Sequence, residues 1–229
     1  MLEICDLRFR YGTPGAGWIV DISRLDVGAG EQVLLTGTSG RGKSTLLNLI
    51  AGILDPVEGR VVIDGVEVHA LRGAARDRFR GRTIGMIFQT FNLLLGFTAE
   101  ENVMAALMFS GVPRGEHRER ARGLLKRLGM VKYESPAESL SVGQQQRVAV
   151  ARAVACGPKL VLADEPTASL DPDSGRAAMD LVQGVCREIG AALVCVSHDP
   201  SMGARFERRE RLEELSRGAA HAAVPAEGA

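Results

Sequence analysis

The sequence predicts an α/β fold in which a parallel sheet is covered by helices on both sides. Short runs rich in Val, Ile and Leu recur along the chain, and several have no polar face, which is typical of strands buried on both faces. Helical stretches lie between these runs and supply the cover. The expected strands are residues 2–9, 32–36, 61–63, 84–88, 160–163 and 193–196, and the expected core helices are 44–51, 144–155 and 175–189.

Two regions depart from this core. Strands early in the chain alternate in hydrophobicity, and the pair Asp64–Gly65 is typical of a tight hairpin turn, which indicates an antiparallel layer packed on the core. No strand-like run occurs between Phe88 and Leu160, where helices are expected at 100–109 and 116–128. We expect one domain at residues 1–217, with a helical subdomain at about 89–139, and a flexible tail at 218–229 whose composition cannot bury a core.

Composition excludes several classes of protein. The 28 Lys and Arg residues balance the 28 Asp and Glu residues, so no net charge attracts nucleic acid or anionic lipid. The four cysteines are widely spaced and form no CxxC pair, which argues against a zinc site or a disulfide framework and fits a reducing cytosol. No apolar run is long enough to span a bilayer, and the first residues do not read as a signal sequence. We expect a chain that is neither secreted nor embedded in a membrane.

A phosphate-binding loop follows the strand QVLLT and precedes a helix. It matches the pattern GxxxxGK[ST], in which glycines let successive backbone N–H groups close around phosphate oxygens and the helix offers its positive end. Lys43 is expected to reach the outer phosphates and Ser44 to ligate magnesium. A purely structural glycine turn is the alternative. The predicted nucleotide-binding residues are Gly37, Thr38, Ser39, Gly40, Arg41, Gly42, Lys43, Ser44 and Thr45.

Two carboxylates end the apolar strand KLVLA, where charge is costly unless a cation or a reaction uses it. Asp164 is expected to hold magnesium through its water shell. Glu165, one residue later, is expected to polarise the attacking water as general base. A solvated strand end is the alternative interpretation.

Three further side chains follow strands and are candidates for the same site. His198 comes directly after VCVS and is placed to reach the γ-phosphate, and Gln89 closes IGMIFQ with an amide that can contact both magnesium and water. Tyr11 lies near the end of the first strand and can stack on the base, although stacking does not select adenine over guanine. A structural histidine, a surface-loop glutamine and an edge-packed tyrosine remain open alternatives.

A second exposed helix start lies at LSVGQ, directly before the helix QQQRVAVARAVA. Helix N-termini of this kind bind anions. Since the phosphate loop already covers one side of the triphosphate, the economical arrangement is a two-fold dimer in which Ser141 and Gly143 face the γ-phosphate held by the other chain. An ordinary Ser-capped helix is the alternative.

Taken together, LSVGQQQRVAVARA, VLADEPTASLD and SHD resemble the ATP-binding subunits of ABC transporters over about residues 2–205. The resemblance implies ATP with Mg²⁺, an adenine-stacking Tyr11, a Q-loop glutamine at Gln89 and a switch histidine at His198. It also implies a signature at residues 140–144 and a D-loop at 169–171, so that Gln144 and Asp171 join the contacts made in trans. The stretch FQTFNLLLGFTAEENV is similar to the macrolide-exporter and lipoprotein-release group.

The chain departs from the family pattern at two places. Val142 stands where the signature usually has glycine, and we hypothesise that it weakens dimer closure if the backbone there needs a positive φ. Residues 205–217 (RFERRERLEELSR) replace the short strands that such subunits often carry. The charge spacing of Glu207 with Arg211, and of Arg209 with Glu213, predicts a solvated helix.

The resemblance implies an ATPase engine: two ATP molecules close a dimer, hydrolysis reopens it, and an integral membrane permease seated near residues 89–101 takes up the motion. The expected location is the cytoplasmic face of the membrane, without nucleic acid as a partner. Soluble ABC ATPases with coiled-coil insertions are disfavoured because only about fifty residues separate Gln89 from the signature. A phosphate-loop kinase or GTPase is disfavoured because no NKxD motif occurs and the signature would have no role in it. A non-hydrolysing subunit is disfavoured because Glu165 and His198 are present.

Overall fold

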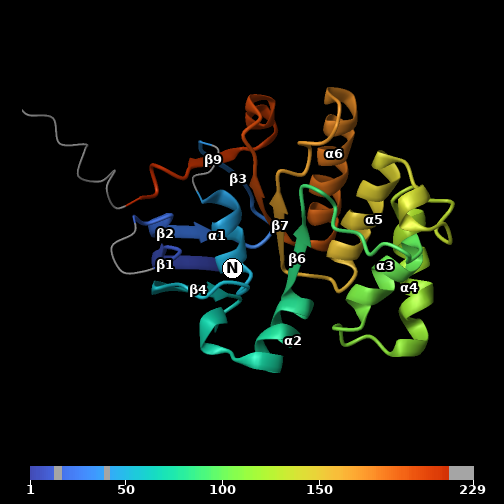
Figure 1. Cartoon of the computed structure of the whole chain (residues 1–229), viewed down its shortest axis with the longest axis horizontal. Helices are drawn as coiled ribbons and strands as arrows, with labels where there is room; N and C mark the ends of the chain where they lie inside the picture. The colour runs from blue at the N-terminus through green and yellow to red at the C-terminus, as the bar shows by residue number, and fades with distance from the viewer. Residues whose placement is uncertain (13–16, 39–41, 217–229) are drawn as a thin grey trace, which may run out of the picture.

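The computed structural model describes residues 1–12, 17–38 and 42–216, and these residues form two sheets and six α-helices. The central sheet has the order β6-β7-β8-β3-β9 and is parallel throughout, while the second sheet has the order β2-β1-β4-β5 and is antiparallel. Helices lie on both sides of the central sheet (Figure 1). The predicted α/β class is confirmed.

The element bounds agree closely with the predicted core and add elements that were not predicted. The strands are β1 Leu2–Phe9, β2 Val20–Val27, β3 Gln32–Thr36, β4 Glu58–Ile63, β5 Val66–Glu67, β6 Ile84–Ile87, β7 Leu160–Asp164, β8 Ala192–Val196 and β9 Arg208–Arg211. The helices are α1 Lys43–Ile50, α2 Gly73–Thr83, α3 Ala99–Leu107, α4 His117–Arg127, α5 Val142–Val154 and α6 Pro172–Ile189, and short 3₁₀ turns lie at Val68–Ala70, Arg114–Glu116, Ala137–Ser139 and Pro200–Arg205. Strands β2 and β9 and helix α2 were not predicted, and β5 was predicted only as the second arm of the hairpin.

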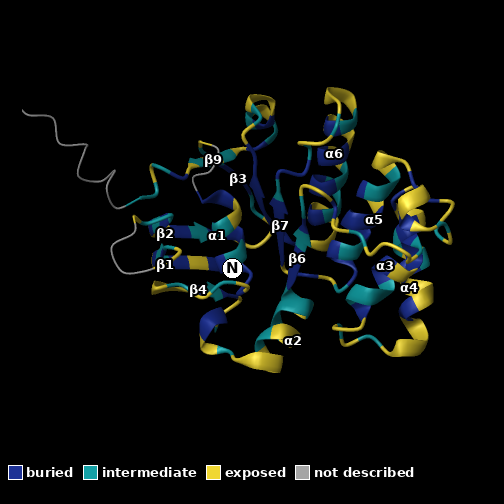
Figure 2. Cartoon of the chain, viewed as in Figure 1, coloured by how far each residue is buried: buried dark blue, intermediate teal, exposed yellow. Residues whose placement is uncertain are grey.

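The central sheet is buried on both faces. Every residue of β8 is buried, and so is every residue of β7 except the half-buried Asp164. Side chains alternate between two apolar clusters: Val33 and Leu35 of β3 join the cluster that contains α1, whereas Leu34 joins the one that contains α5 and α6. Figure 2 shows these strands as dark blue. The helix of the phosphate loop and the helix of the signature therefore pack on opposite faces of one sheet.

The antiparallel sheet packs on the α1 side, because Leu2, Ile4 and Leu7 of β1 belong to the same cluster as the apolar residues of α1. Its hairpin β4–β5 turns at Asp64 and Gly65, whose φ values are 53° and 77°. Both values are positive, as a two-residue type I′ turn requires. The predicted hairpin in an antiparallel layer is confirmed.

Helices α3 and α4 lie on the α5 side, farthest from the antiparallel sheet (Figure 1). Val103 of α3 and Leu125 of α4 pack in one cluster with Val148 of α5, and this cluster continues to the sheet. No strand element occurs between β6 and β7 in the described chain, as expected. The bounds of a separate subdomain at 89–139 and of a domain at 1–217 stay predictions, and the tail at 218–229 lies outside the described residues. No described helix combines the length and apolar character that a bilayer crossing requires.

The helix predicted within residues 205–217 is wrong. Arg208–Arg211 form β9, which pairs in parallel with β3 along the sheet edge. One pair has a spacing of two, since Arg208 Nε donates to Glu210 Oε1 at 2.8 Å. Arg208 Nη1 also donates to Glu31 Oε1, far away in the sequence, at 2.9 Å. A spacing of two is the strand period and suits a strand whose edge is solvated, and neither of the expected i, i+4 pairs forms among the described residues. A turn at residues 212–215 follows.

The close approach of α5 to β6 yields a stability prediction. A Cβ at Gly85 would lie 2.3 Å from the carbonyl oxygen of Ala153, so Gly85→Ala must push the signature helix off the sheet. Such overpacking costs about 1–3 kcal/mol. Gly123→Ala in α4 meets no atom within 4 Å, and we expect it to stabilise the helix by about 0.5–1 kcal/mol. Urea unfolding of both variants measures the difference, and equal stability would show that α5 does not depend on this glycine.

Candidate nucleotide-binding and catalytic site

The loop between β3 and α1 is built around Lys43. This lysine is the first residue of α1 and is buried, and its Nζ donates to the carbonyl oxygens of Gly37 at 2.9 Å and Thr38 at 3.2 Å. No acidic side chain lies in the first turn of α1 and no side chain caps it, so its N-terminal N–H groups are available to an anion. The predicted residues Ser39, Gly40 and Arg41 lie outside the described residues.

Gly42 shows why this position must be glycine. Its φ is 85°, in the left-handed region, and a Cβ would lie 2.4 Å from the carbonyl oxygen of Ile19 and 2.9 Å from its Cγ2. The residue before β2 thus presses against the end of the phosphate loop. Any side chain here would displace the loop from the start of α1.

Asp164, at the end of β7, carries a buried carboxylate oxygen. Its Oδ1 has no hydrogen-bond partner within the described part of the chain. Burial is the main cause that raises the pKa of Asp164, and the neighbouring charge of Glu165 raises it further. A hydrogen bond with Ser44 and the charge of Lys43 lower the pKa but do not cancel the increase. A buried carboxylate oxygen next to a serine hydroxyl is an oxygen donor set of the kind that Mg²⁺ prefers. Ser44 itself is exposed and Thr45 is half-buried.

Glu165 and His198 are in direct contact. The Glu165 Oε1 atom lies 2.7 Å from His198 Nδ1, and Oε2 accepts from the His198 backbone N–H at 3.3 Å. Glu165 is buried and has φ 46°, which is unusual for a residue other than glycine, and its N–H is held by the carbonyl of Val196 at 3.0 Å. The two predicted catalytic groups meet because β7 and β8 are parallel neighbours, so their carboxyl ends adjoin.

Gln89 and Tyr11 lie exposed at two other strand ends. Gln89 follows β6, the neighbour of β7 on its other side, and its side chain makes no hydrogen bond with the described residues. Tyr11 is 54% exposed, and its ring contacts Phe9 edge-on with centroids 4.8 Å apart. Both side chains are free to contact a ligand.

The tip of α5 is an ordinary capped helix start that also faces solvent. The Ser141 hydroxyl accepts from the Gln144 N–H at 3.4 Å, and Gln144 Oε1 accepts from the Ser141 N–H at 3.0 Å, which completes a capping box. A Cβ at Gly143 would meet nothing within 4 Å. Val142 is the first helical residue and does not have a positive φ. The condition for backbone strain in our Val142 hypothesis is therefore not met.

Asp171, expected to act in trans, also has a role in its own chain. Its Oδ1 accepts from the N–H groups of Asp173 at 3.1 Å and Ser174 at 3.0 Å, so it caps α6. Hydrogen bonds with Ser174 are the main cause that lowers the pKa of Asp171. The residue is exposed, so its remaining oxygen can reach a neighbouring molecule.

Sequence reasoning missed one residue at the site, Glu213. Its Oε1 accepts from the Thr38 N–H at 3.0 Å and from the Thr38 hydroxyl at 3.2 Å. These bonds, led by the backbone N–H of Thr38, lower the pKa of Glu213. The turn after β9 thus holds the first part of the phosphate loop. The available signal was the period-two charge pattern of β9, which was read as a helix.

Comparison with known proteins agrees with this geometry. The family model described as ABC transporter matches residues 20–168. The chain belongs to the ABC transporter family. It is an ATP-binding subunit of this family, which confirms the predicted nucleotide class and the predicted ATPase activity. The match includes the phosphate loop, the signature and the carboxylates after β7.

Similar ABC proteins are found among both curated and solved proteins. The lipoprotein-releasing system ATP-binding protein LolD of Cereibacter sphaeroides is 44% identical over 208 residues, covering 90% of this chain and 92% of that protein. The dimeric ATP-binding cassette MJ0796, in a post-hydrolysis state bound to ADP and Pi, has a TM-score of 0.82 at 35% identity and covers 92% of this chain and 94% of that one. The cbiO1 protein of Clostridium perfringens, part of the transporter complex cbiONQ, has a TM-score of 0.76 at 30% identity, over 86% and 78%. The expected likeness to the lipoprotein-release group is confirmed.

The Gly42 geometry gives a prediction for this ABC subunit. Gly42→Ala should weaken binding of a fluorescent ATP analogue by more than about tenfold, or 1.4 kcal/mol, because the new methyl group would overlap the Ile19 carbonyl oxygen. Gly190→Ala is the control, since Gly190 also has a positive φ, 69°, but meets nothing within 4 Å and ends α6. It should keep ATP affinity while losing about 1–2 kcal/mol of stability. Undiminished affinity in a folded Gly42→Ala protein would contradict the proposed loop geometry.

Proposed function

We propose that the chain hydrolyses ATP at a composite site formed by two copies of itself. The observation that carries this proposal is the placement of α1 and α5 on opposite faces of the central sheet. One chain therefore presents its two anion-binding helix tips on different sides. A triphosphate on the phosphate loop of one copy would receive Ser141, Gly143 and Gln144 from the other, with Asp171 near the shared boundary. The dimer of the similar cassette MJ0796 supports this arrangement.

Binding of the nucleotide would replace contacts that the phosphate loop now makes with itself. The Lys43 ammonium would exchange the carbonyl oxygens of Gly37 and Thr38 for the β- and γ-phosphates, where a charge-assisted bond is worth about 1.5–3 kcal/mol. The free N–H groups at the start of α1 would bind the remaining phosphate oxygens. Tyr11 would stack on the adenine ring.

The donor set beside the loop fits Mg²⁺. Ser44, Asp164 and Gln89 supply hydroxyl, carboxylate and amide oxygens, and the unpartnered buried Oδ1 of Asp164 is satisfied only if a cation or an ordered water reaches it. When bound, Mg²⁺ supplies neutralisation of the charge that develops on the phosphate oxygens. Asp164 would hold the metal through its water shell.

Glu165 would act as general base in an in-line attack of water on the γ-phosphorus. The water proton moves to the carboxylate as the new O–P bond forms and the bond to the ADP oxygen breaks. His198 fixes the Glu165 carboxylate through the 2.7 Å contact, and its exposed ring has room to turn toward the γ-phosphate. The left-handed backbone of Glu165 directs the side chain out of the strand.

The partner would be an integral membrane permease, seated on an apolar groove next to Gln89. This groove has a volume of about 590 Å³ and lies between β6 with α2 on one side and α3 with α5 on the other, lined by Ile53, Met86, Phe88, Ala106, Phe109 and Cys156. The loop after Gln89 adds exposed apolar side chains at Leu94, Leu95 and Phe97. A permease on this surface would keep the subunit at the cytoplasmic face of the membrane, and similarity to LolD favours a permease of the lipoprotein-releasing kind.

The base assignment is tested with Glu165→Gln. The amide cannot accept the water proton, so we expect ATP turnover to fall by at least about 10²-fold. ATP binding should persist, and saturating Mg-ATP should trap a dimer that light scattering detects. The matched control is Glu119→Gln, the same chemical change on the exposed face of α4.

Two results would contradict the proposal in different ways. Full turnover in Glu165→Gln would remove Glu165 from the role of base. A monomer under trapping conditions, with the membrane partner present, would exclude the composite site even if turnover is lost.

A further inference from the structure

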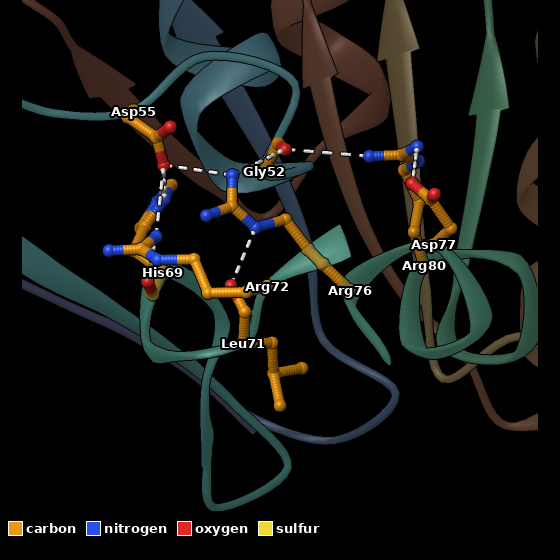
Figure 3. A network of polar contacts seen from close by, with 8 residues as sticks. All are labelled: Gly52, Asp55, His69, Leu71, Arg72, Arg76, Asp77 and Arg80. Carbon is orange, nitrogen blue, oxygen red and sulfur yellow. Dashed lines mark hydrogen bonds and ion pairs between the residues drawn. The ribbon is translucent and has the colours of Figure 1, made fainter. Parts of the chain in front are cut away.

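A second groove lies beside the apolar one and is lined by arginines. It has a volume of about 770 Å³ and lies between the loop after α1 and one face of α2. Figure 3 shows its polar network. We call it the arginine groove and define it by Asp55, His69, Arg72, Arg76, Asp77 and Arg80.

Three arginines, Arg72, Arg76 and Arg80, lie on one face of α2 and its N-cap because they are spaced at i, i+4 and i+8. Helix α2 has no fully buried residue, so apolar packing does not account for its arginine-rich face. Its N-terminus has no side-chain cap and no acidic residue in its first turn, although such residues stabilise helix starts. Arg72 stands at the N-cap instead. The helix end and the Arg72 guanidinium therefore add their positive charge at one place.

Arg76 and Arg80 already make contacts that hold α2 in place. Arg76 Nη1 lies 2.8 Å from Asp55 Oδ1, and Arg76 and Arg80 each donate to the carbonyl oxygen of Gly52 at 3.4 Å. Gly52 directly follows Ala51, the C-cap of α1, so these bonds hold α2 against the carboxyl end of that helix (Figure 3). Helix α1 has eight residues, about 12 Å, and starts in the phosphate loop. The arginine groove and the phosphate loop thus lie at opposite ends of α1.

Arg72 is the arginine of the groove whose side chain is available to a ligand. It is 74% exposed, its Nη1 is 3.9 Å from Asp55 Oδ1, and its one short bond is to the carbonyl of His69 at 2.7 Å. Asp55 and Asp77 are 62% and 56% exposed and face three arginines. Exposed pairs of this kind contribute little and exchange readily, so an incoming carboxylate can take Arg72 without breaking the fold.

The arginine groove is continuous with the apolar groove, because Ile53, Asp77 and Arg80 line both. A segment that places apolar side chains between α2 and α3 would meet Arg80, which lines both grooves, and its extension into the arginine groove would meet Arg72. We propose that the arginine groove binds an acidic segment of the membrane partner, with a carboxylate of that segment paired to Arg72. This inference rests on the permease contact proposed above for the apolar groove. It adds that the adjoining arginine groove binds carboxylates of the same partner.

The test compares Arg72→Glu with Arg78→Glu. Arg78 is on the same helix, is exposed and makes no ion pair with any described residue, but it does not line the groove. Glutamate is favourable at a helix N-terminus, so Arg72→Glu should fold. The probe is the membrane protein that co-purifies with the Glu165→Gln chain in Mg-ATP. Arg72→Glu should weaken its binding at least about tenfold, while Arg78→Glu changes binding less than about twofold.

A charge exchange completes the test. Changing acidic residues of the partner's cytoplasmic segment to Arg, one at a time, should restore binding to Arg72→Glu in at least one case. Vesicles of phosphatidylcholine, with and without phosphatidylglycerol, should not distinguish wild type from Arg72→Glu. Equal loss in both variants, or a loss that only anionic vesicles reveal, would overturn the inference in favour of general attraction to lipid. Unchanged partner binding with intact basal turnover and dimerisation would reject the arginine groove alone, whereas absence of any dimer would reject the proposed function.

Discussion

Burial of both faces of the central parallel sheet is the constraint on which the rest of the structure depends. Since β7, β8 and β3 have no polar face, they need helices on each side, which sets α1 against one face and α5 against the other. Parallel pairing also brings their carboxyl ends to one edge. Charged groups too costly for the strands collect there, and Glu165 meets His198 at 2.7 Å. The same constraint that brings these groups to one edge sets α1 and α5 on opposite faces of the sheet, the placement on which the proposed two-chain site rests.

The parts of the fold that follow this constraint were predictable from the sequence. Strands β1 and β3 begin and end at the predicted residues, and the other core strands differ by a few residues at their ends. The phosphate loop, the carboxylates after β7 and His198 were predictable because each is marked by a local pattern at the end of an apolar run. Their proximity followed from parallel topology. The roles of these residues remain proposals that the placement supports.

The missed elements differ in what holds them: β2 buries Val20, Ile22, Leu25 and Val27 in the core, whereas α2 and β9 depend largely on polar contacts between distant parts of the chain. Strand β2 pairs with β1 and adds the ion pair between Arg8 and Asp21. Helix α2 has no fully buried residue; its Phe79 packs partly against the core, and its arginines bond to Gly52. Strand β9 is charged throughout, and the link from Glu213 to Thr38 spans 175 positions. Hydrophobic periodicity carries no information about such contacts, so local charge spacing was misread as a helix.

The most direct test of the composite site is complementation between two inactive chains. Lys43→Ala removes the phosphate-loop lysine but keeps the α5 tip, and Ser141→Arg blocks the α5 tip but keeps the phosphate loop. In a mixed dimer one site would have both intact halves and the other would have neither. ATP turnover of the mixture should therefore exceed the sum of the two separate proteins, rising as the chains exchange. Turnover equal to that sum at every mixing ratio, with mixed dimers present, would contradict the account.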